Sequence, residues 1–196
     1  MNFRLLGVLS FVMLFAGCAA TGPGTMQEKG KTVEQVQPKV EPNALAAYAS
    51  AVSAMRAGNM QLAETKFKKL AIDYPQYSGP HNNLGIIYFH AGDIEKARAS
   101  FNKALELNPK SVVSLNHLGI ISRGEGKFKE ALDYYERALK IDPDYPYVHL
   151  NMGILLELYM GKLPEALEHY KRYQELTKEE DKKVNGWIVD LGRRIK

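Results

Sequence analysis

The sequence predicts an all-α protein in which four helix pairs stack into a solenoid and a final helix closes the stack. Three observations predict this fold. Related residues recur at a spacing of 34, as between Leu84 and Leu118. Each period contains two runs with the apolar spacing of an amphipathic helix, separated by a turn that contains glycine. A proline follows the second run, as in ALELNP and ALKIDP, where it ends one helix before the next begins.

The first 17 residues have the pattern of a secretory signal. Arg4 precedes an apolar run from Leu5 to Phe15, which is too short to span a bilayer comfortably. The letters FAGC at its end resemble a bacterial lipobox, with Phe15 where leucine is usual. The resemblance implies that residues 1–17 are a lipoprotein signal peptide and that Cys18, the only cysteine, is lipidated, palmitate included. The alternative is an ordinary cleaved signal that contains a cysteine.

Residues 18–42 are expected to form a flexible, lipid-anchored linker. They contain glycine, proline and charged residues with little apolar periodicity. Ala19, rather than aspartate, follows Cys18, and the lipoprotein resemblance then implies the periplasmic face of the outer membrane. Residues 43–196 are long enough to form a single folded domain.

The four units are expected at about 44–77, 78–111, 112–145 and 146–178. Their small residues stand where two helices must approach closely, and an aromatic residue fills the space between the helices. The pattern resembles the tetratricopeptide repeat (TPR) family, which implies a right-handed superhelix. The residues that carry the resemblance in the second and third units are Leu84, Gly85, Tyr88, Gly92, Ala97, Phe101, Ala104 and Pro109, and Leu118, Gly119, Gly126, Ala131, Tyr135, Ala138 and Pro143.

The fourth unit differs from the others in length. Gly153 and Gly161 are 8 residues apart, whereas Gly85 and Gly92 are 7 apart, so one residue is inserted near the end of its first helix or in its turn.

A capping helix is expected over residues 178–196, with Thr177 and Glu180 as a capping box at its start. Its apolar residues share one face, and its polar side suits the end of a solenoid.

The partner-binding residues are inferred from the resemblance. In the family the first helix of each pair lines a concave groove that binds a peptide or a helix. Asparagine in such a groove can both donate to and accept from a peptide bond. The isoleucines of the second row could instead pack between neighbouring helices, and that alternative stays open. The three rows are Tyr48, Asn82, Asn116 and Leu150; Val52, Ile86, Ile120 and Ile154; and Met55, Phe89, Arg123 and Glu157.

Charge and motif searches exclude several other functions. The net charge of +4 is interspersed along helical faces, so nucleic acid is not an expected partner. The five histidines lack the spacing of a helical metal site, and no nucleophile motif or phosphate-binding loop is present. We therefore expect neither an enzyme nor a cofactor or metal.

The expected function is that of a protein-binding scaffold. The chain looks like the helical-repeat pilotin lipoproteins, which help pilus secretins assemble, although those carry more than four repeats. The expected partners are a segment of an envelope protein and, through Cys18, the membrane; self-association is left open. The alternatives are an adaptor of peptidoglycan enzymes and, from another class, a hydrolase in the groove that uses His117.

Overall fold

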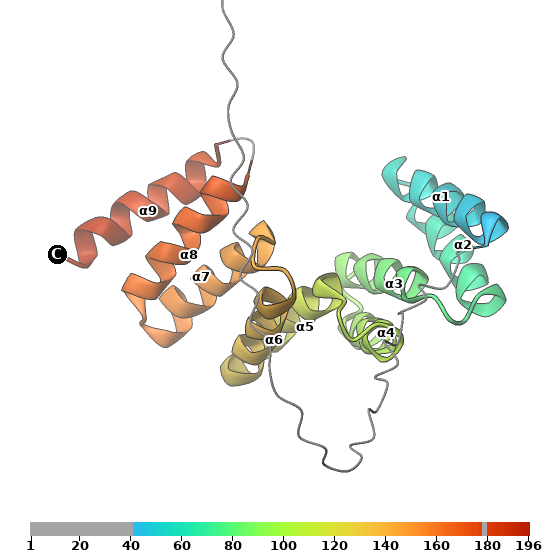
Figure 1. Cartoon of the computed structure of the whole chain (residues 1–196), viewed down its shortest axis with the longest axis horizontal. Coiled ribbons are helices and arrows are strands. Elements are labelled where there is room, and N and C mark those ends of the chain that lie inside the picture. Colours follow the sequence, from blue (N-terminus) through green and yellow to red (C-terminus); the bar gives the residue numbers. More distant parts are fainter. Residues whose placement is uncertain (1–40, 178–179) are drawn as a thin grey trace, which may run out of the picture. The chain divides into compact units, whose positions relative to one another are not determined.

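The computed structural model describes residues 41–177 and 180–196, and every regular element in this part of the chain is an α-helix (Figure 1). The helices are α1 (Pro42–Arg56), α2 (Met60–Asp73), α3 (Ser78–His90), α4 (Ile94–Leu107), α5 (Val112–Gly124), α6 (Phe128–Ile141), α7 (Pro146–Met160), α8 (Leu163–Leu176) and α9 (Lys182–Arg194). The all-α prediction is confirmed. The predicted signal peptide, Cys18 and nearly all of the predicted linker lie outside the described residues. None of the described helices has the length and apolarity needed to cross a membrane.

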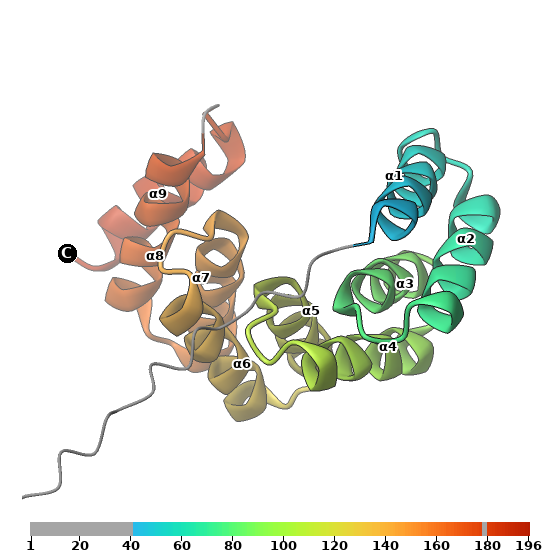
Figure 2. The same ribbon diagram turned by 45° about the vertical axis from the view of Figure 1, so that its right-hand side comes forward.

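The helices form four consecutive pairs and a last single helix. The closest packing is within the pairs α1 and α2, α3 and α4, α5 and α6, and α7 and α8. Each second helix also packs against the first helix of the following pair, and α5 contacts both α3 and α7 (Figure 2). The first helices of successive pairs are therefore neighbours, and side chains that they present on a common side can form one continuous surface.

Glycine makes the turn inside each pair. Gly58, Gly92, Gly126 and Gly161 have φ values of 78°, 80°, 75° and 66°, a left-handed conformation that other residues rarely adopt. Helix α7 of the fourth unit, which carries the inserted residue, has 15 residues where α5 has 13, and it continues up to the turn glycine Gly161.

The core of each pair is built around one aromatic residue of the second helix. Phe67, Phe101, Tyr135 and Tyr170 are fully or almost fully buried. A glycine of the first helix faces the ring in three of the pairs. A Cβ atom added at Gly119 would lie 2.4 Å from Cε1 of Tyr135, so the ring occupies the space that any other residue would need. The small residues that the repeat pattern singles out are thus required by packing.

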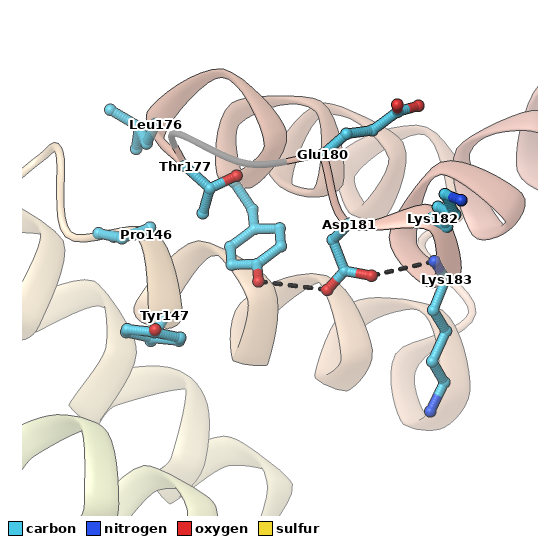
Figure 3. Close-up of a pocket in the computed structure, with 9 residues that line it drawn as sticks. Pro146, Tyr147, Leu176, Thr177, Glu180, Asp181, Lys182 and Lys183 are labelled. Atoms are coloured by element: carbon cyan, nitrogen blue, oxygen red, sulfur yellow. Dashed lines mark hydrogen bonds between the residues drawn. The ribbon is translucent and has the colours of Figure 1, made fainter.

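The start of α9 differs from the sequence-based prediction. The carboxylate of Asp181 caps this helix, since its Oδ1 accepts hydrogen bonds from the backbone N–H groups of Lys183 and Val184 at 3.0 and 3.2 Å (Figure 3). The Thr177 hydroxyl instead donates to the Gln174 carbonyl oxygen at 3.2 Å. The predicted capping box of Thr177 and Glu180 is therefore wrong, because the helix begins at Lys182 and Asp181 is the side chain within reach of its free amides.

Helix α9 packs against α8 through its apolar face. Val184 and Leu191 are buried, and the ring of Trp187 lies 5.3 Å from that of Tyr170. The charged residues at the end of this helix remain exposed, as a terminal element of a stack requires.

Candidate functional site

The first predicted row joins neighbouring first helices through hydrogen bonds. Asn83 donates to the Tyr48 hydroxyl at 2.7 Å, which links α3 to α1. Asn82 accepts a hydrogen bond from the hydroxyl of Ser111 at 3.1 Å and another from Ser114, which links α3 to α5. These polar side chains hold the stack together on the side where the groove was predicted.

Asn116 is the most buried of the predicted groove residues that carry an amide. Only 4% of its surface is exposed, and its Oδ1 accepts a hydrogen bond from Nδ2 of Asn151 at 3.0 Å. Asn151 also donates to the Tyr147 carbonyl oxygen at 2.9 Å, so its amide bridges α7 and α5. Asn116 is therefore engaged by the neighbouring first helix, and its contact with a partner stays a prediction that would require this hydrogen bond to open. Asn82 is half-buried and stays a prediction.

The second row combines the two roles that the sequence left open. Val52, Ile86 and Ile154 are half-buried and pack against clusters of core residues. Leu150, from the first row, does the same. Their remaining exposed surface faces away from those clusters, so each residue has a structural contact without being closed to a ligand. Ile120 is also half-buried, and it lines a cavity.

In the third row, Glu157 makes contacts within the chain. Glu157 is only 11% exposed, and its carboxylate accepts a hydrogen bond from the Tyr170 hydroxyl at 3.0 Å and pairs with Arg194 of α9 at 2.7 Å. Both partners belong to this chain, so Glu157 links α7 to the last helix, and its contact with a ligand stays a prediction that would require these bonds to open. Met55 is half-buried against the first core cluster.

Three of the predicted residues meet at one cavity of about 400 Å³. Phe89 of α3 and Ile120 and Arg123 of α5 lie in its wall. Roughly 300–1,000 Å³ is the usual volume of a ligand pocket. The other wall residues, which the sequence reasoning did not identify, are Ile94, Ile121, Gly124, Glu125 and Tyr159.

One of the missed wall residues has a signal in the sequence. Tyr159 lies in the last turn of α7, within the 8-residue interval that contains the inserted residue, and its ring stacks on Phe128 with the centroids 4.6 Å apart. The 8-residue spacing before Gly161 thus marks an altered surface beside the groove.

The charges at this cavity are unequally paired. Glu125 pairs with Lys127 at 2.9 Å and with Arg98, and these two cations lower the pKa of its carboxyl group. Arg123 makes one long hydrogen bond, from Nη1 to the Asn151 carbonyl oxygen at 3.3 Å. Among residues 41–177 and 180–196, no carboxylate oxygen lies within 4.0 Å of its guanidinium. The cavity therefore presents an apolar wall beside a cation that lacks an acidic partner.

His117, the residue of the hydrolase alternative, has a packing role. Its ring stacks on Phe101 with the centroids 4.8 Å apart, and its Nδ1 lies 2.9 Å from the Val113 carbonyl oxygen. Burial lowers its pKa. No group of three or more histidine, cysteine or acidic side chains suited to a metal ion occurs in the part of the chain that the structure describes. These contacts explain His117 without catalysis.

A second cavity lies away from the predicted groove. It has a volume of about 700 Å³ and is formed where the start of α7 meets the end of α8 and the start of α9 (Figure 3). Its Tyr173 hydroxyl lies 3.3 Å from Asp181, the residue that caps α9. The Asp181 carboxylate is occupied by capping α9, and the cavity is the space left where the ends of three helices meet.

The comparisons with known proteins support the repeat fold. The Tetratricopeptide repeat family matches residues 76–144 and 110–179, which together span more than half of the 196 residues. The solved structure of Pseudomonas aeruginosa pilF is 21% identical, with a TM-score of 0.67 over 77% of this chain and 68% of that chain. MamA from Desulfovibrio magneticus RS-1 is 19% identical, with a TM-score of 0.64 over 80% of this chain and 87% of that chain. At these identities the two structures show the fold alone. The search of curated proteins finds no significant match.

Proposed function

The chain belongs to the tetratricopeptide repeat family, and we propose that it is a lipid-anchored module of the cell envelope. Domains of this family are in general non-enzymatic scaffolds for protein–protein interaction. In our proposal the surface formed by the first helices of the pairs, α1, α3, α5 and α7, binds a peptide or helix of an envelope protein. The module thereby helps to assemble an envelope complex such as a pilus or secretion machine.

One observation carries the binding part of the proposal. The cavity beside Phe89, Ile120 and Arg123 has a volume of about 400 Å³ and lies where the repeat resemblance expects a ligand. It combines apolar side chains with a cation, the mixture by which a groove takes apolar anchors and fixes the direction of a bound segment.

The anchor and the location rest on the amino-terminal sequence. The short apolar run that ends in FAGC supports cleavage before Cys18 and lipidation of its thiol, and Ala19 supports the outer membrane. Several acyl chains on one residue hold a protein at a membrane where a single chain would be marginal.

Site-specific photo-crosslinking in the native envelope tests the binding part. A photoreactive residue at Ile120 should capture one envelope protein, whereas the same residue at the exposed Lys129 of α6 should capture none. Capture from Lys129 alone, or from neither position, would contradict groove binding.

The anchor is tested separately. Cys18→Ser should leave an unprocessed precursor and abolish labelling with a palmitate analogue, while Ser10→Ala in the same segment should leave both unchanged. An unchanged mature mass in Cys18→Ser would contradict the lipoprotein assignment.

A further inference from the structure

The cavity on the first-helix side has an unusual arrangement of hydrogen-bond donors. A guanidinium group has five N–H donors and no acceptor. Arg123 uses one of them for the long hydrogen bond to Asn151, and in the described part of the chain it meets no acid. A half-buried arginine in this state gains most from a carboxylate, with which it can form two parallel hydrogen bonds.

A second unused donor lies in the core of the same unit. The Tyr135 hydroxyl is fully buried and has no hydrogen-bond partner among the described residues. Burial raises the pKa of this hydroxyl, and the positive charge of Arg123 acts in the opposite direction. The Tyr135 hydroxyl is enclosed in the core, so Arg123 is the group that presents unused donors at the cavity.

The fourth unit shows how an acid satisfies the same position. Tyr170 corresponds to Tyr135, and Glu157 lies 34 residues after Arg123. There the Glu157 carboxylate accepts from the tyrosine hydroxyl at 3.0 Å and pairs with Arg194 at 2.7 Å. In the third unit Arg123 stands where the fourth unit has Glu157, so no carboxylate of the described residues accepts from the hydroxyl of Tyr135.

The surrounding charges favour an acidic ligand. Arg123 and Glu125 are the charged residues of the cavity wall, and Glu125 is already paired with Arg98 and Lys127, so the unpaired charge at the wall is the positive charge of Arg123. A basic segment would be repelled by Arg123, and a purely apolar one would leave the guanidinium partly desolvated without a partner.

We propose that the cavity binds an internal segment of the partner in which an aspartate or glutamate stands next to a large apolar residue. The carboxylate pairs with Arg123, and the apolar side chain enters between Phe89, Ile120 and Tyr159. The segment runs through the site because partly exposed isoleucines continue along the neighbouring first helices at Ile86 and Ile154. This inference rests on the proposed function, since it names the chemistry of the segment that the same surface takes.

Selection from a display library of short random peptides, embedded between flexible flanks, tests the inference with the purified full chain. The selected pool should be enriched in acidic residues adjacent to leucine, isoleucine or phenylalanine. For a peptide chosen from that pool, Arg123→Gln should weaken binding about tenfold, as expected for the loss of a charge-assisted hydrogen-bonded pair. The wild-type affinity should also fall as salt is raised.

Three variants serve as controls. Arg137→Gln removes an exposed arginine that pairs with Asp133 on α6, and it should leave binding unchanged. Arg123→Lys keeps the charge and should lose less affinity than Arg123→Gln, which separates loss of charge from misfolding. Arg123→Glu should favour peptides in which lysine replaces the acidic residue.

The outcomes separate this inference from the proposed function. Binding without a preference for acidic residues, or a preference that survives Arg123→Gln, would overturn the inference and leave groove binding intact. A requirement for a free terminal carboxylate would also overturn it. Failure to select any peptide, or binding that is indifferent to Ile120→Asp, would remove the groove itself and the proposed function with it.

Discussion

The third and fourth units bury a tyrosine at the same repeat position, but they surround its hydroxyl with different groups. Tyr170 donates to Glu157 at 3.0 Å, and Arg194 of the last helix holds that carboxylate at 2.7 Å. Tyr135 has no hydrogen-bond partner among the described residues, and the residue that replaces the glutamate is Arg123. Burial raises the pKa of both hydroxyl groups.

The difference shows how one repeat position serves two purposes. In the fourth unit the variable residue of the first helix binds side chains of its own chain, which fixes a terminal helix. In the third unit it lies at a cavity and keeps most of its donors unused. Arg123 and Glu157 occupy corresponding positions on the first helices of the two pairs, so the identity of this side chain contributes to whether the position stabilises the stack or is available to a ligand.

The largest expected effect concerns what the two units share. Gly119→Ala would place Cβ 2.4 Å from Tyr135, and Gly153→Ala would place it 2.6 Å from Tyr170. Each ring is rigid and fully buried, so overpacking should lower the free energy of unfolding by about 2–3 kcal/mol in either variant. Urea denaturation followed by circular dichroism measures this.

A glycine of the last helix is the matched control. Nothing lies within 4 Å of a Cβ added at Gly186, so Gly186→Ala should raise the free energy of unfolding by about 0.5–1 kcal/mol through helix propensity. A Gly119→Ala variant as stable as wild type would mean that the Tyr135 ring has room to move. It would contradict the claim that the same close glycine–tyrosine contact holds both units together.

The next effect concerns the polar contacts that only the fourth unit makes. Glu157→Ala leaves the buried Tyr170 hydroxyl without an acceptor and Arg194 without its partner on α7, so we expect a loss of about 1–2 kcal/mol. Hydrogen exchange should show that α9 loses protection first. Arg123→Ala, which removes one long hydrogen bond, should cost clearly less. If Glu157→Ala and Arg123→Ala lowered the free energy of unfolding equally, the distinction between a side chain bound within the stack and one available to a ligand would be contradicted.

The fold was predictable because its determinants recur along the chain. The 34-residue spacing, the turn glycines and the small residues opposite Phe101 and Tyr135 follow from packing inside one helix pair, and that packing repeats in each unit. The positions of helices could therefore be derived from the sequence by comparing one copy with the next. The start of α9 lies outside the repeat, so no other copy indicated that Asp181 caps it.

The site was less predictable because its contacts join different units. Phe89, Ile120 and Arg123 were identified as groove residues, and the structure brings them to one cavity. The burial of Asn116 depends on Asn151, which is 35 residues away, and the pairing of Glu157 depends on Arg194, which is 37 residues away. The 35-residue spacing of Asn116 and Asn151 recurs between Tyr48 and Asn83, but the hydrogen bond depends on which side chains stand at those positions. The partner of Glu157 lies on α9, which is outside the repeat.

Removing the tyrosine hydroxyl should change the free energy of unfolding by a smaller amount, and in opposite directions in the two units. Tyr170→Phe removes a hydroxyl that is satisfied and leaves Glu157 with one partner fewer, so we expect a loss of about 1 kcal/mol. Tyr135→Phe removes a buried hydroxyl without a partner, so stability should stay the same or rise by up to about 1 kcal/mol. Thermal unfolding of both variants measures the contrast. A Tyr135→Phe variant that loses as much stability as Tyr170→Phe would show that its hydroxyl is satisfied after all.

The smallest effect at neutral pH concerns a histidine pair of the fourth unit, whose counterparts in the third unit are Leu115 and Tyr134. Nδ1 of His149 lies 2.9 Å from Nδ1 of His169, and Nε2 of His149 lies 2.8 Å from the Pro143 carbonyl oxygen. A carbonyl only accepts, so Nε2 of His149 donates to it. Nδ1 of neutral His149 is then the acceptor for His169.

This pair should make stability depend on pH in a defined direction. Burial, followed by the proximity of His149, lowers the pKa of His169 to about 4, whereas an unfolded histidine titrates near about 6.5. Between these values the unfolded chain binds a proton that the folded chain does not, so the free energy of unfolding should fall as the pH drops from about 6.5 to about 4. His149→Leu with His169→Tyr copies the third unit and should flatten this slope in urea titrations. Burial also lowers the pKa values of His81 and His117, so part of the slope should remain. An unchanged slope in the double variant would contradict the assignment of this pH dependence to the histidine pair.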